Sequence, residues 1–253
     1  MAEKIVTAAL LIIGNEILSG RTQDANINYL AKGLAQIGVR LKEVRVVADE
    51  EPAIIAAVRA LSAAYDYLFT TGGIGPTHDD ITAECVAKAF DMPLKRDPRA
   101  VERLLKQIKP EDLNEARLRM ANIPEGADLI DNPVSSAPGF RLRNVHVMAG
   151  VPRIMQAMFD GIKPTLVGGA KVVSASVVIH APEGLVATPL AQIQQAAPEV
   201  EIGSYPFARQ GRFGTVIVTR GTDPARVAAV SAQVAAMARA LGAEVEEEEL
   251  QIP

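Results

Sequence analysis

Residues 67–82, Tyr-Leu-Phe-Thr-Thr-Gly-Gly-Ile-Gly-Pro-Thr-His-Asp-Asp-Ile-Thr, decide the fold of the first half of the chain. An apolar strand over 67–71 runs into a loop with three glycines in four residues, and residues 82–90 have helical spacing. Strand-like runs at 6–13 and 39–47 precede it, and helical patterns beginning near Asp24 and Asp49 follow those runs. This alternation predicts a mostly parallel sheet with right-handed crossovers, and hence the α/β class.

The segments after residue 90 complete the first domain and then predict a second, smaller one. Helices are expected at 97–108 and 113–120, a long loop with at most one short strand at 123–139, a strand at 145–148 and a helix at 153–159. The alternation restarts after Gly168, so we predict domains at 1–168 and 169–253. The second is a small α+β domain with strands at 171–179, 200–204 and 215–219 and helices at 189–196 and 223–241. The acidic tail from Glu244 is expected to be solvated, although Leu250 and Ile252 could extend a strand.

Composition excludes several classes of protein. The 253 residues are 49% hydrophobic and 22% charged, which suits a chain with a real core. The net charge is −4, but five acids lie in the last ten residues, so the body is nearly neutral and a nucleic-acid-coating protein is not indicated. The single cysteine, Cys85, fits a reducing compartment and is expected in the core. No signal-peptide pattern or apolar run of membrane-spanning length is present, so we expect a cytoplasmic protein without membrane contact.

The glycine loop is the strongest functional signal. Glycines let backbone N–H groups approach a phosphate, and the N-terminus of the following helix favours an anion. Ligands of open parallel sheets bind at the carboxyl ends of the strands, where this loop lies. We therefore expect a phosphate-bearing small molecule at Thr71, Gly72, Gly73, Ile74, Gly75, Pro76 and Thr77. A tight turn without function is the alternative.

Asp79 and Asp80 follow this loop directly. Two carboxylates would repel a phosphate unless a hard divalent cation bridges them, so they are candidate metal ligands. In the alternative interpretation one of them caps the helix near Ile81 and the other is solvated; both roles can coexist. The three histidines lack the spacing of a zinc site, and only His78, within the loop segment, is a candidate for function.

Two further loops are expected at the same edge of the sheet. Gly14, Asn15 and Glu16 follow the first strand, whereas Asp24 and Asp49 begin helices. Each acid alone is more simply a cap, but their clustering at one sheet edge favours a function. A third segment supplies small residues that suit a phosphate or a carboxylate: Ser135, Ser136, Pro138 and Gly139.

These motifs resemble the MoaB/Mog molybdopterin-binding domain family, and most closely its CinA branch. The resemblance rests on residues 14–20, Asp24 with Asn26, residues 47–50 and residues 71–80, in the family's order, and covers residues 5–168. Ile74 replaces the threonine usual in Mog-type loops, which favours the CinA branch, whereas residues 148–152 depart from the family's later proline-rich turn. Residues 170–243 resemble the small KH-like domain that follows in CinA. An amidase domain would come next in full-length CinA, and that activity is not implied here.

The resemblance implies a three-layer α/β/α sandwich and an assembly of several identical copies. It also implies that Asp80 and Asp49 match the family's functional aspartates. Two functions remain open. In the first, the protein is a hydrolase of nucleotide pyrophosphates such as ADP-ribose or FAD, dependent on Mg²⁺, Mn²⁺ or Co²⁺. Asp80 and Asp49 are then catalytic, and Asp79, Asp80 and Glu16 hold the metal. In the second, the pocket binds molybdopterin or a similar pterin without hydrolysing it.

A third hypothesis concerns Gly211-Arg212-Phe213-Gly214, which matches the G-x-x-G sequence that clamps nucleic acid in KH domains. The motif is expected between two strands, where a glycine pair most simply forms a hairpin turn. Nucleic-acid binding is therefore the least favoured of the three hypotheses.

Overall fold

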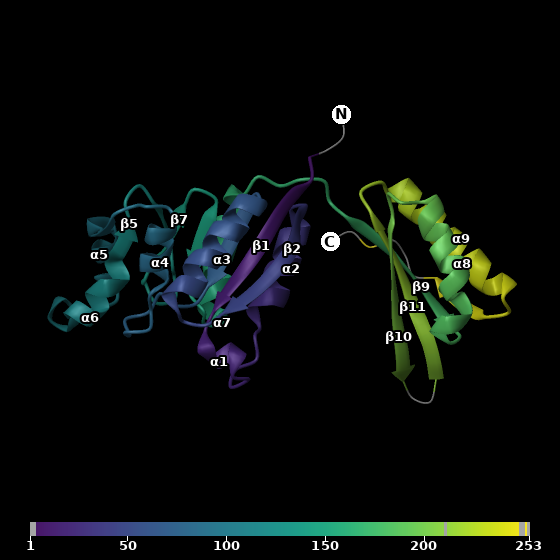
Figure 1. Cartoon of the computed structure of the whole chain (residues 1–253), viewed down its shortest axis with the longest axis horizontal. Coiled ribbons are helices and arrows are strands. Elements are labelled where there is room, and N and C mark those ends of the chain that lie inside the picture. Colours follow the sequence, from purple (N-terminus) through teal and green to yellow (C-terminus); the bar gives the residue numbers. More distant parts are fainter. Residues whose placement is uncertain (1–3, 210–211, 248–250, 252–253) are drawn as a thin grey trace. The chain divides into compact units, whose positions relative to one another are not determined.

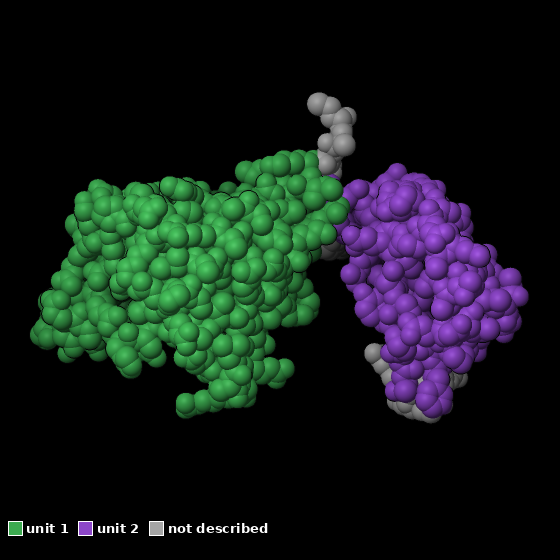
Figure 2. Space-filling view, viewed as in Figure 1, with its two compact units in different colours: residues 1–169 green, residues 170–253 purple. Residues whose placement is uncertain are grey.

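The computed structural model describes residues 4–209, 212–247 and 251. The chain forms two compact units, residues 1–169 and 170–253 (Figure 2). The boundary lies one residue beyond the position expected from the sequence.

A six-stranded sheet forms the centre of the first unit (Figure 1). Its order is β2 (Val39–Val47), β1 (Val6–Ile13), β3 (Tyr67–Thr71), β8 (Val145–Met148), β7 (Gly139–Leu142) and β6 (Asp128–Ile130). The first four strands are parallel, and β7 and β6 run antiparallel to their neighbours. Because β1 is paired on both sides and nearly all its residues are buried, it reads as the continuous apolar run that the sequence displays.

Helices cover both faces of this sheet (Figure 1). On one face α2 (Asn26–Gln36) and α7 (Pro152–Ile162) pack through Leu30 and Phe159. On the other, α3 (Glu51–Ala64) and α4 (Thr82–Ala89) pack through Val58 and Cys85. The predicted three-layer sandwich is confirmed, and so is the core position of Cys85, whose burial raises the pKa of the thiol to about 12.

The stretch between α4 and β6 is more broken than the sequence indicated. It contains β4 (Leu94–Arg96), α5 (Pro98–Leu104), the 3₁₀ turn Pro110–Asp112, α6 (Glu115–Leu118), the 3₁₀ turn Arg119–Ala121 and β5 (Asn122–Pro124). The expected cap is present, since Asp97 accepts a 2.8 Å bond from Arg99 N. The helix predicted at 113–120 is confirmed in part: residues 115–121 are helical, but as one α turn followed by a 3₁₀ turn. The single-strand expectation for 123–139 is wrong, because β5 and β6 both lie in or at the edge of that segment. Strands of three residues are too short to show alternation.

The second unit is a four-stranded antiparallel sheet with two helices on one face (Figure 1). The strand order is β10 (Glu201–Arg209), β11 (Arg212–Gly221), β9 (Val173–His180) and β12 (Glu244–Glu247). The helices are α8 (Glu183–Ala196) and α9 (Pro224–Ala240). The sequence placed the start of α8 at Pro189, which is wrong: six residues precede it and the proline lies inside the helix. Proline favours a first helical turn, so the sequence pattern was misleading here.

The acidic tail is partly structured. β12 pairs with β9, Glu246 contacts His180 at 2.9 Å and Glu247 contacts Arg239 at 2.6 Å. The glutamates of β12 nevertheless remain exposed, so the prediction that they are solvated is confirmed, whereas the strand they form was not predicted. Leu250 and Ile252 lie outside the described residues, as does Gly211 of the G-x-x-G sequence. The other three residues, Arg212, Phe213 and Gly214, begin β11 and pair antiparallel with the end of β10, so the sequence does not lie between two helices as in a KH domain. Within the described ranges, the structure contains no helix long and apolar enough to cross a membrane.

Candidate functional site

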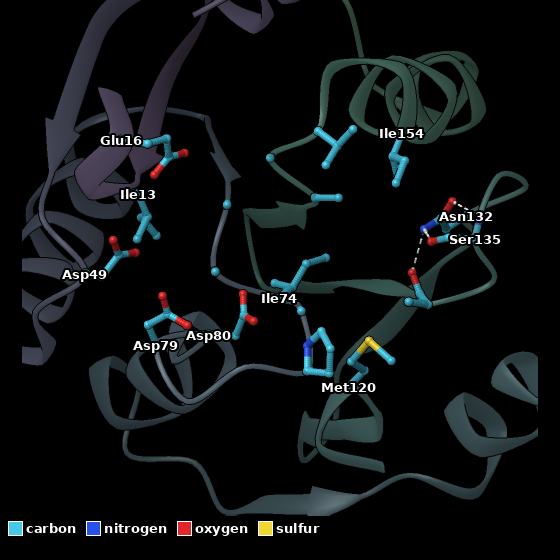
Figure 3. A pocket seen from close by; sticks show the side chains of 18 of the residues that line it. Ile13, Glu16, Asp49, Ile74, Asp79, Asp80, Met120, Asn132, Ser135 and Ile154 are labelled. Carbon is cyan, nitrogen blue, oxygen red and sulfur yellow. Dashed lines mark hydrogen bonds between the residues drawn. The ribbon is translucent and has the colours of Figure 1, made fainter. Parts of the chain in front are cut away.

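A pocket of about 510 Å³ opens at the carboxyl ends of β1 and β3 (Figure 3). The glycine loop contributes Gly72, Gly73, Ile74, Gly75 and Pro76 to its wall. The pocket therefore lies where ligands of open parallel sheets bind, and its volume suits a nucleotide-sized molecule.

The backbone of the glycine loop requires glycine at two positions. Gly72 and Gly73 have φ angles of +104° and +66°. A Cβ on Gly72 would lie 2.1 Å from Ile13 O, and one on Gly73 would lie 2.2 Å from Thr82 Oγ1. Thr82 locks the loop, because its buried hydroxyl donates to Gly72 O (2.9 Å) and its amide donates to Gly73 O (3.0 Å). A tight turn without function, the alternative considered from the sequence, therefore explains Gly72 and Gly73. The same turn also places the loop at the wall of the pocket.

Asp80 is held by its own loop and not by the helix that follows. Its Oδ2 accepts bonds from Thr77 N (2.8 Å) and Thr77 Oγ1 (2.5 Å). The cap position of α4 is Ile81, and no side chain caps this helix, so the expectation that Asp79 or Asp80 caps it is wrong. Thr77 itself does not line the pocket; it orients Asp80, which does.

Asp79 lies at the pocket wall beside Asp80 (Figure 3). Hydrogen bonding from Thr77 and from its own backbone amide lowers the pKa of Asp79, and the charges of His78 and Arg119 add to this shift. Asp79 is therefore ionised at neutral pH. His78 is 96% exposed and does not line the pocket.

Glu16 and Asp49 complete the acidic side of the pocket (Figure 3). The Asp49 carboxylate accepts a 2.8 Å bond from Asn15 N, at the start of the short helix α1 (Asn15–Leu18). The expectation that Asp49 caps α3 is wrong, since Glu50 occupies the cap position and no side chain bonds there. Glu16 folds back over Gly14, where a Cβ would lie 2.6 Å from its carboxylate oxygens. Gly14 and Asn15 do not line the pocket but position the two acids that do.

The opposite side of the pocket is formed by Asn132 and Ser135 with Met120 and Ile154 (Figure 3). Asn132 ties its loop together: Nδ2 donates to Ser135 Oγ (2.7 Å) and to Ala137 O (2.9 Å). Of the predicted residues in this loop only Ser135 lines the pocket.

The three predicted residues that follow Ser135 have other places in the fold. Ser136 adopts a positive φ of 60°, and Pro138 is buried. Gly139 lies in β7, where a Cβ would lie 2.1 Å from Val147 O. Packing, and not ligand contact, accounts for this glycine.

A smaller side chamber of about 40 Å³ adjoins the main pocket, and five residues line both: Ile13, Glu16, Thr22, Gly150 and Pro152. Two of the predicted ligand-binding residues, Asp24 and Thr71, line this chamber and not the main pocket. The cap predicted at Asp24 is confirmed, since its Oδ1 accepts a 2.8 Å bond from Ile27 N in the first turn of α2.

The pocket carries four carboxylates: Glu16, Asp49, Asp79 and Asp80. No lysine or arginine lines it among the described residues. Nor does this part of the chain contain a group of three or more His, Cys, Asp or Glu side chains placed to hold a metal ion by themselves. A cation caged by protein alone therefore does not fit the site. A cation shared between one or two carboxylates and the phosphate oxygens of a ligand does fit, which is the usual mode for Mg²⁺.

Sequence reasoning missed several lining residues. Asn132, Met120 and Ile154 are far from the glycine loop in the sequence, and only folding brings them to the same pocket. Asn26, in the side chamber, could have been found, because it follows the capping Asp24 at the start of a helix that begins at the same sheet edge.

The fold and the site together define a doubly covered α/β domain with a ligand pocket at the carboxyl ends of its parallel strands. The chain belongs to the family described as "Probable molybdopterin binding domain", whose model matches residues 9–167. A second model, described as "FAD synthase, middle domain", matches residues 171–245.

Individual relatives agree with this assignment. A CinA-like protein of Desulfosudis oleivorans is 36% identical over 214 residues, which cover 78% of this chain and 51% of that protein. A protein named probable FAD synthase from Caenorhabditis elegans is 37% identical over 181 residues, covering 63% of this chain and 35% of that protein. The solved structure of the protein CinA from Thermoplasma acidophilum is 34% identical with a TM-score of 0.60, covering 63% of this chain and 96% of that one. The chain thus spans about half the length of the first relative and about a third of the second.

Proposed function

We propose that the protein is a divalent-metal-dependent hydrolase of a nucleotide pyrophosphate, of the kind represented by ADP-ribose or FAD. One observation carries the proposal: the pocket combines a glycine loop suited to phosphate with four carboxylates and, in the described chain, no lining lysine or arginine. Phosphate would be repelled from such a wall unless a cation neutralises the charge. The similarity to proteins named FAD synthase supports a nucleotide as the ligand.

The roles of the residues follow from their positions. The glycine loop would bind the phosphates through its backbone, and Asp79 and Asp80, with Glu16, would hold the cation jointly with phosphate oxygens. A bound Mg²⁺, Mn²⁺ or Co²⁺ would neutralise charge on the phosphates and lower the pKa of an attacking water. Asp49, anchored through Asn15 N, would orient that water or accept its proton.

The test is incubation of the purified protein with ADP-ribose and with FAD in the presence of each of the three metals, with AMP release as the readout. We expect AMP with at least one metal and none after chelation. Absence of AMP under every metal condition would refute the hydrolase.

The second candidate is a binding protein for molybdopterin or a related pterin phosphate. The family description favours it, because the matching model is that of a molybdopterin-binding domain. A ligand that raises the melting temperature equally with and without chelator, and is recovered intact, would favour this function over hydrolysis.

A further inference from the structure

The side chamber beside the pocket contains two buried polar atoms whose hydrogen-bonding capacity is unused. Asn26 is 4% exposed and Thr71 is 1% exposed, and both line the chamber. Among the described residues, neither Asn26 Oδ1 nor Thr71 Oγ1 has a hydrogen-bond partner. Such atoms are costly in a folded protein, so their presence at a cavity connected to a ligand pocket points to a ligand.

The direction of Asn26 is fixed by the turn after β8. Its Nδ2 donates a 2.8 Å bond to Gly150 O, which leaves Oδ1 as the atom available to the chamber. Oδ1 can only accept a hydrogen bond. Glu16 and Asp24 add carboxylates to the same lining, and no described lysine or arginine contributes to it. The chamber therefore favours hydrogen-bond donors and disfavours phosphate.

The volume limits what can enter. About 40 Å³ exceeds the space of one water molecule but is far too small for a purine or pterin ring. The ring or sugar would have to remain in the main pocket of about 510 Å³ and extend one small group through the shared wall at Ile13, Glu16 and Gly150.

We propose that this chamber is a specificity subsite that binds a single hydrogen-bond donor of the ligand, an amino or hydroxyl group, through Asn26 Oδ1 and Thr71 Oγ1. The proposal rests on the proposed function, because it assigns the non-phosphate part of the same ligand. It places the phosphates at the glycine loop and the donor in the side chamber, which is lined by the residue directly before that loop, Thr71.

The chain offers a matched pair of variants to test this. Thr70 and Thr71 are neighbours on β3, both are buried, and both hydroxyls lack a partner in the described structure. Side chains alternate along a strand, so they face opposite sides of the sheet, and Thr71 alone lines the chamber. Thr71→Val and Thr70→Val each replace a hydroxyl by a methyl of the same size. We expect neither variant to melt below the wild type, because each loses an unpartnered buried polar group.

Binding is measured by calorimetry with AMP, with purine riboside 5′-monophosphate, which lacks the amino group, and with 2′-deoxy- and 3′-deoxy-AMP, all in Mg²⁺. We expect Thr71→Val to bind AMP about five- to tenfold more weakly, the loss typical of one hydrogen bond. Thr70→Val should bind as the wild type does. One analogue should show at least the same loss with the wild type, because it also gives up the contact with Asn26 Oδ1, and no further loss with Thr71→Val; this analogue identifies the donor as amine or hydroxyl. Equal binding by both variants, or wild-type binding of all analogues as tightly as AMP, would overturn the subsite.

Failure of the proposed function gives a different pattern. If the wild type binds none of these nucleotides, the proposal that the ligand is a nucleotide fails. The chamber is then tested in crystal structures of the ligand-free wild type and of both variants. An ordered water bonded to Asn26 Oδ1 and Thr71 Oγ1, lost only in Thr71→Val, would support a donor subsite. A dry chamber in the wild type would overturn it.

Discussion

Replacing Asp80 by asparagine separates a ligand-binding carboxylate from a structural one. The structure shows what the substitution leaves intact: Asp80 Oδ2 accepts two bonds from Thr77, and the amide oxygen of asparagine can occupy the same position and accept both. What the substitution removes is the negative charge, and with it the ability to share a divalent cation with phosphate.

The stability cost follows from these two bonds. A hydrogen bond to a charged acceptor contributes about 1.5–3 kcal/mol and a neutral one about 0.5–1.5 kcal/mol, so each bond weakens by about 1 kcal/mol when buried. Thr77 is exposed, and solvent reduces this difference. We therefore expect a loss of at most about 1 kcal/mol, corresponding to a shift in melting temperature of no more than about 4 °C. Turnover should fall by about two orders of magnitude or more if the cation is essential.

Asp97→Asn is the control. Asp97 caps α5 through Arg99 N and lies outside the pocket, so this variant loses charge and stability without touching the ligand. Both variants are assayed by AMP release and by thermal unfolding. The expected result is a folded, inactive Asp80→Asn and a less stable, active Asp97→Asn. If Asp80→Asn melts well below the wild type and still turns over substrate at a similar rate, Asp80 is structural and the reasoning is wrong.

Three further predictions concern the loop, a buried histidine and the metal. Gly72→Ala should destabilise the first unit by about 3 kcal/mol or more in urea unfolding, because its Cβ meets backbone at 2.1 Å, whereas Gly20→Ala, with open space around a φ of +72°, should cost about 1 kcal/mol. Burial lowers the pKa of His146 to about 4, so as the pH falls this histidine binds a proton in the unfolded chain before it does in the folded one. The free energy of unfolding should therefore decrease by about 3 kcal/mol between pH 6.5 and 4, and the variant His146→Phe should not show this decrease. Stabilisation by a nucleotide should disappear on chelation if the protein is the metal-dependent hydrolase, whereas stabilisation by a pterin phosphate should persist if it is the pterin-binding protein.

Much of the fold could be predicted because the relevant signals are local. The bounds predicted for the three strands at 6–13, 39–47 and 67–71 match β1, β2 and β3. β1 and β3 are buried parallel strands and read as apolar runs, whereas β2 lies at the sheet edge and mixes apolar with charged residues. The helix predicted at 223–241 matches α9 to within one residue at each end, and Asp223 caps it by accepting bonds from Ala225 N and Arg226 N. The short strands β5 and β6 were missed because three residues are too few to show an alternation of apolar and polar side chains. The start of α8 was missed because Pro189 is typical of a first helical turn, whereas in the fold it lies inside the helix.

The acids of the site show where sequence reasoning ends. The pattern predicted that Glu16, Asp24 and Asp49 gather with Asp79 and Asp80 at one sheet edge. Four of these acids line the pocket, whereas Asp24 lines the adjoining side chamber. It could not predict what holds them. An aspartate before a helix can accept a bond from more than one backbone amide. Asp49, which follows β2, accepts from Asn15 N, which follows the neighbouring strand β1, and not from an amide of its own helix α3. That choice depends on the parallel pairing of β1 with β2, a contact between residues far apart in the sequence.

This choice of partners has a chemical consequence for the pocket. Asp80 uses one oxygen on Thr77 of its own loop, Asp49 uses one on the first amide of α1, and both carboxylates stay at the pocket wall. Asn15 donates to Asp49 through a backbone N–H that any residue except proline would supply, so the identity of Asn15 is less constrained than that of Asp49. Thr77 donates through its hydroxyl as well as its amide, so its side chain matters for the position of Asp80. Charge at the wall and glycine at the turn are the features that substitution cannot replace.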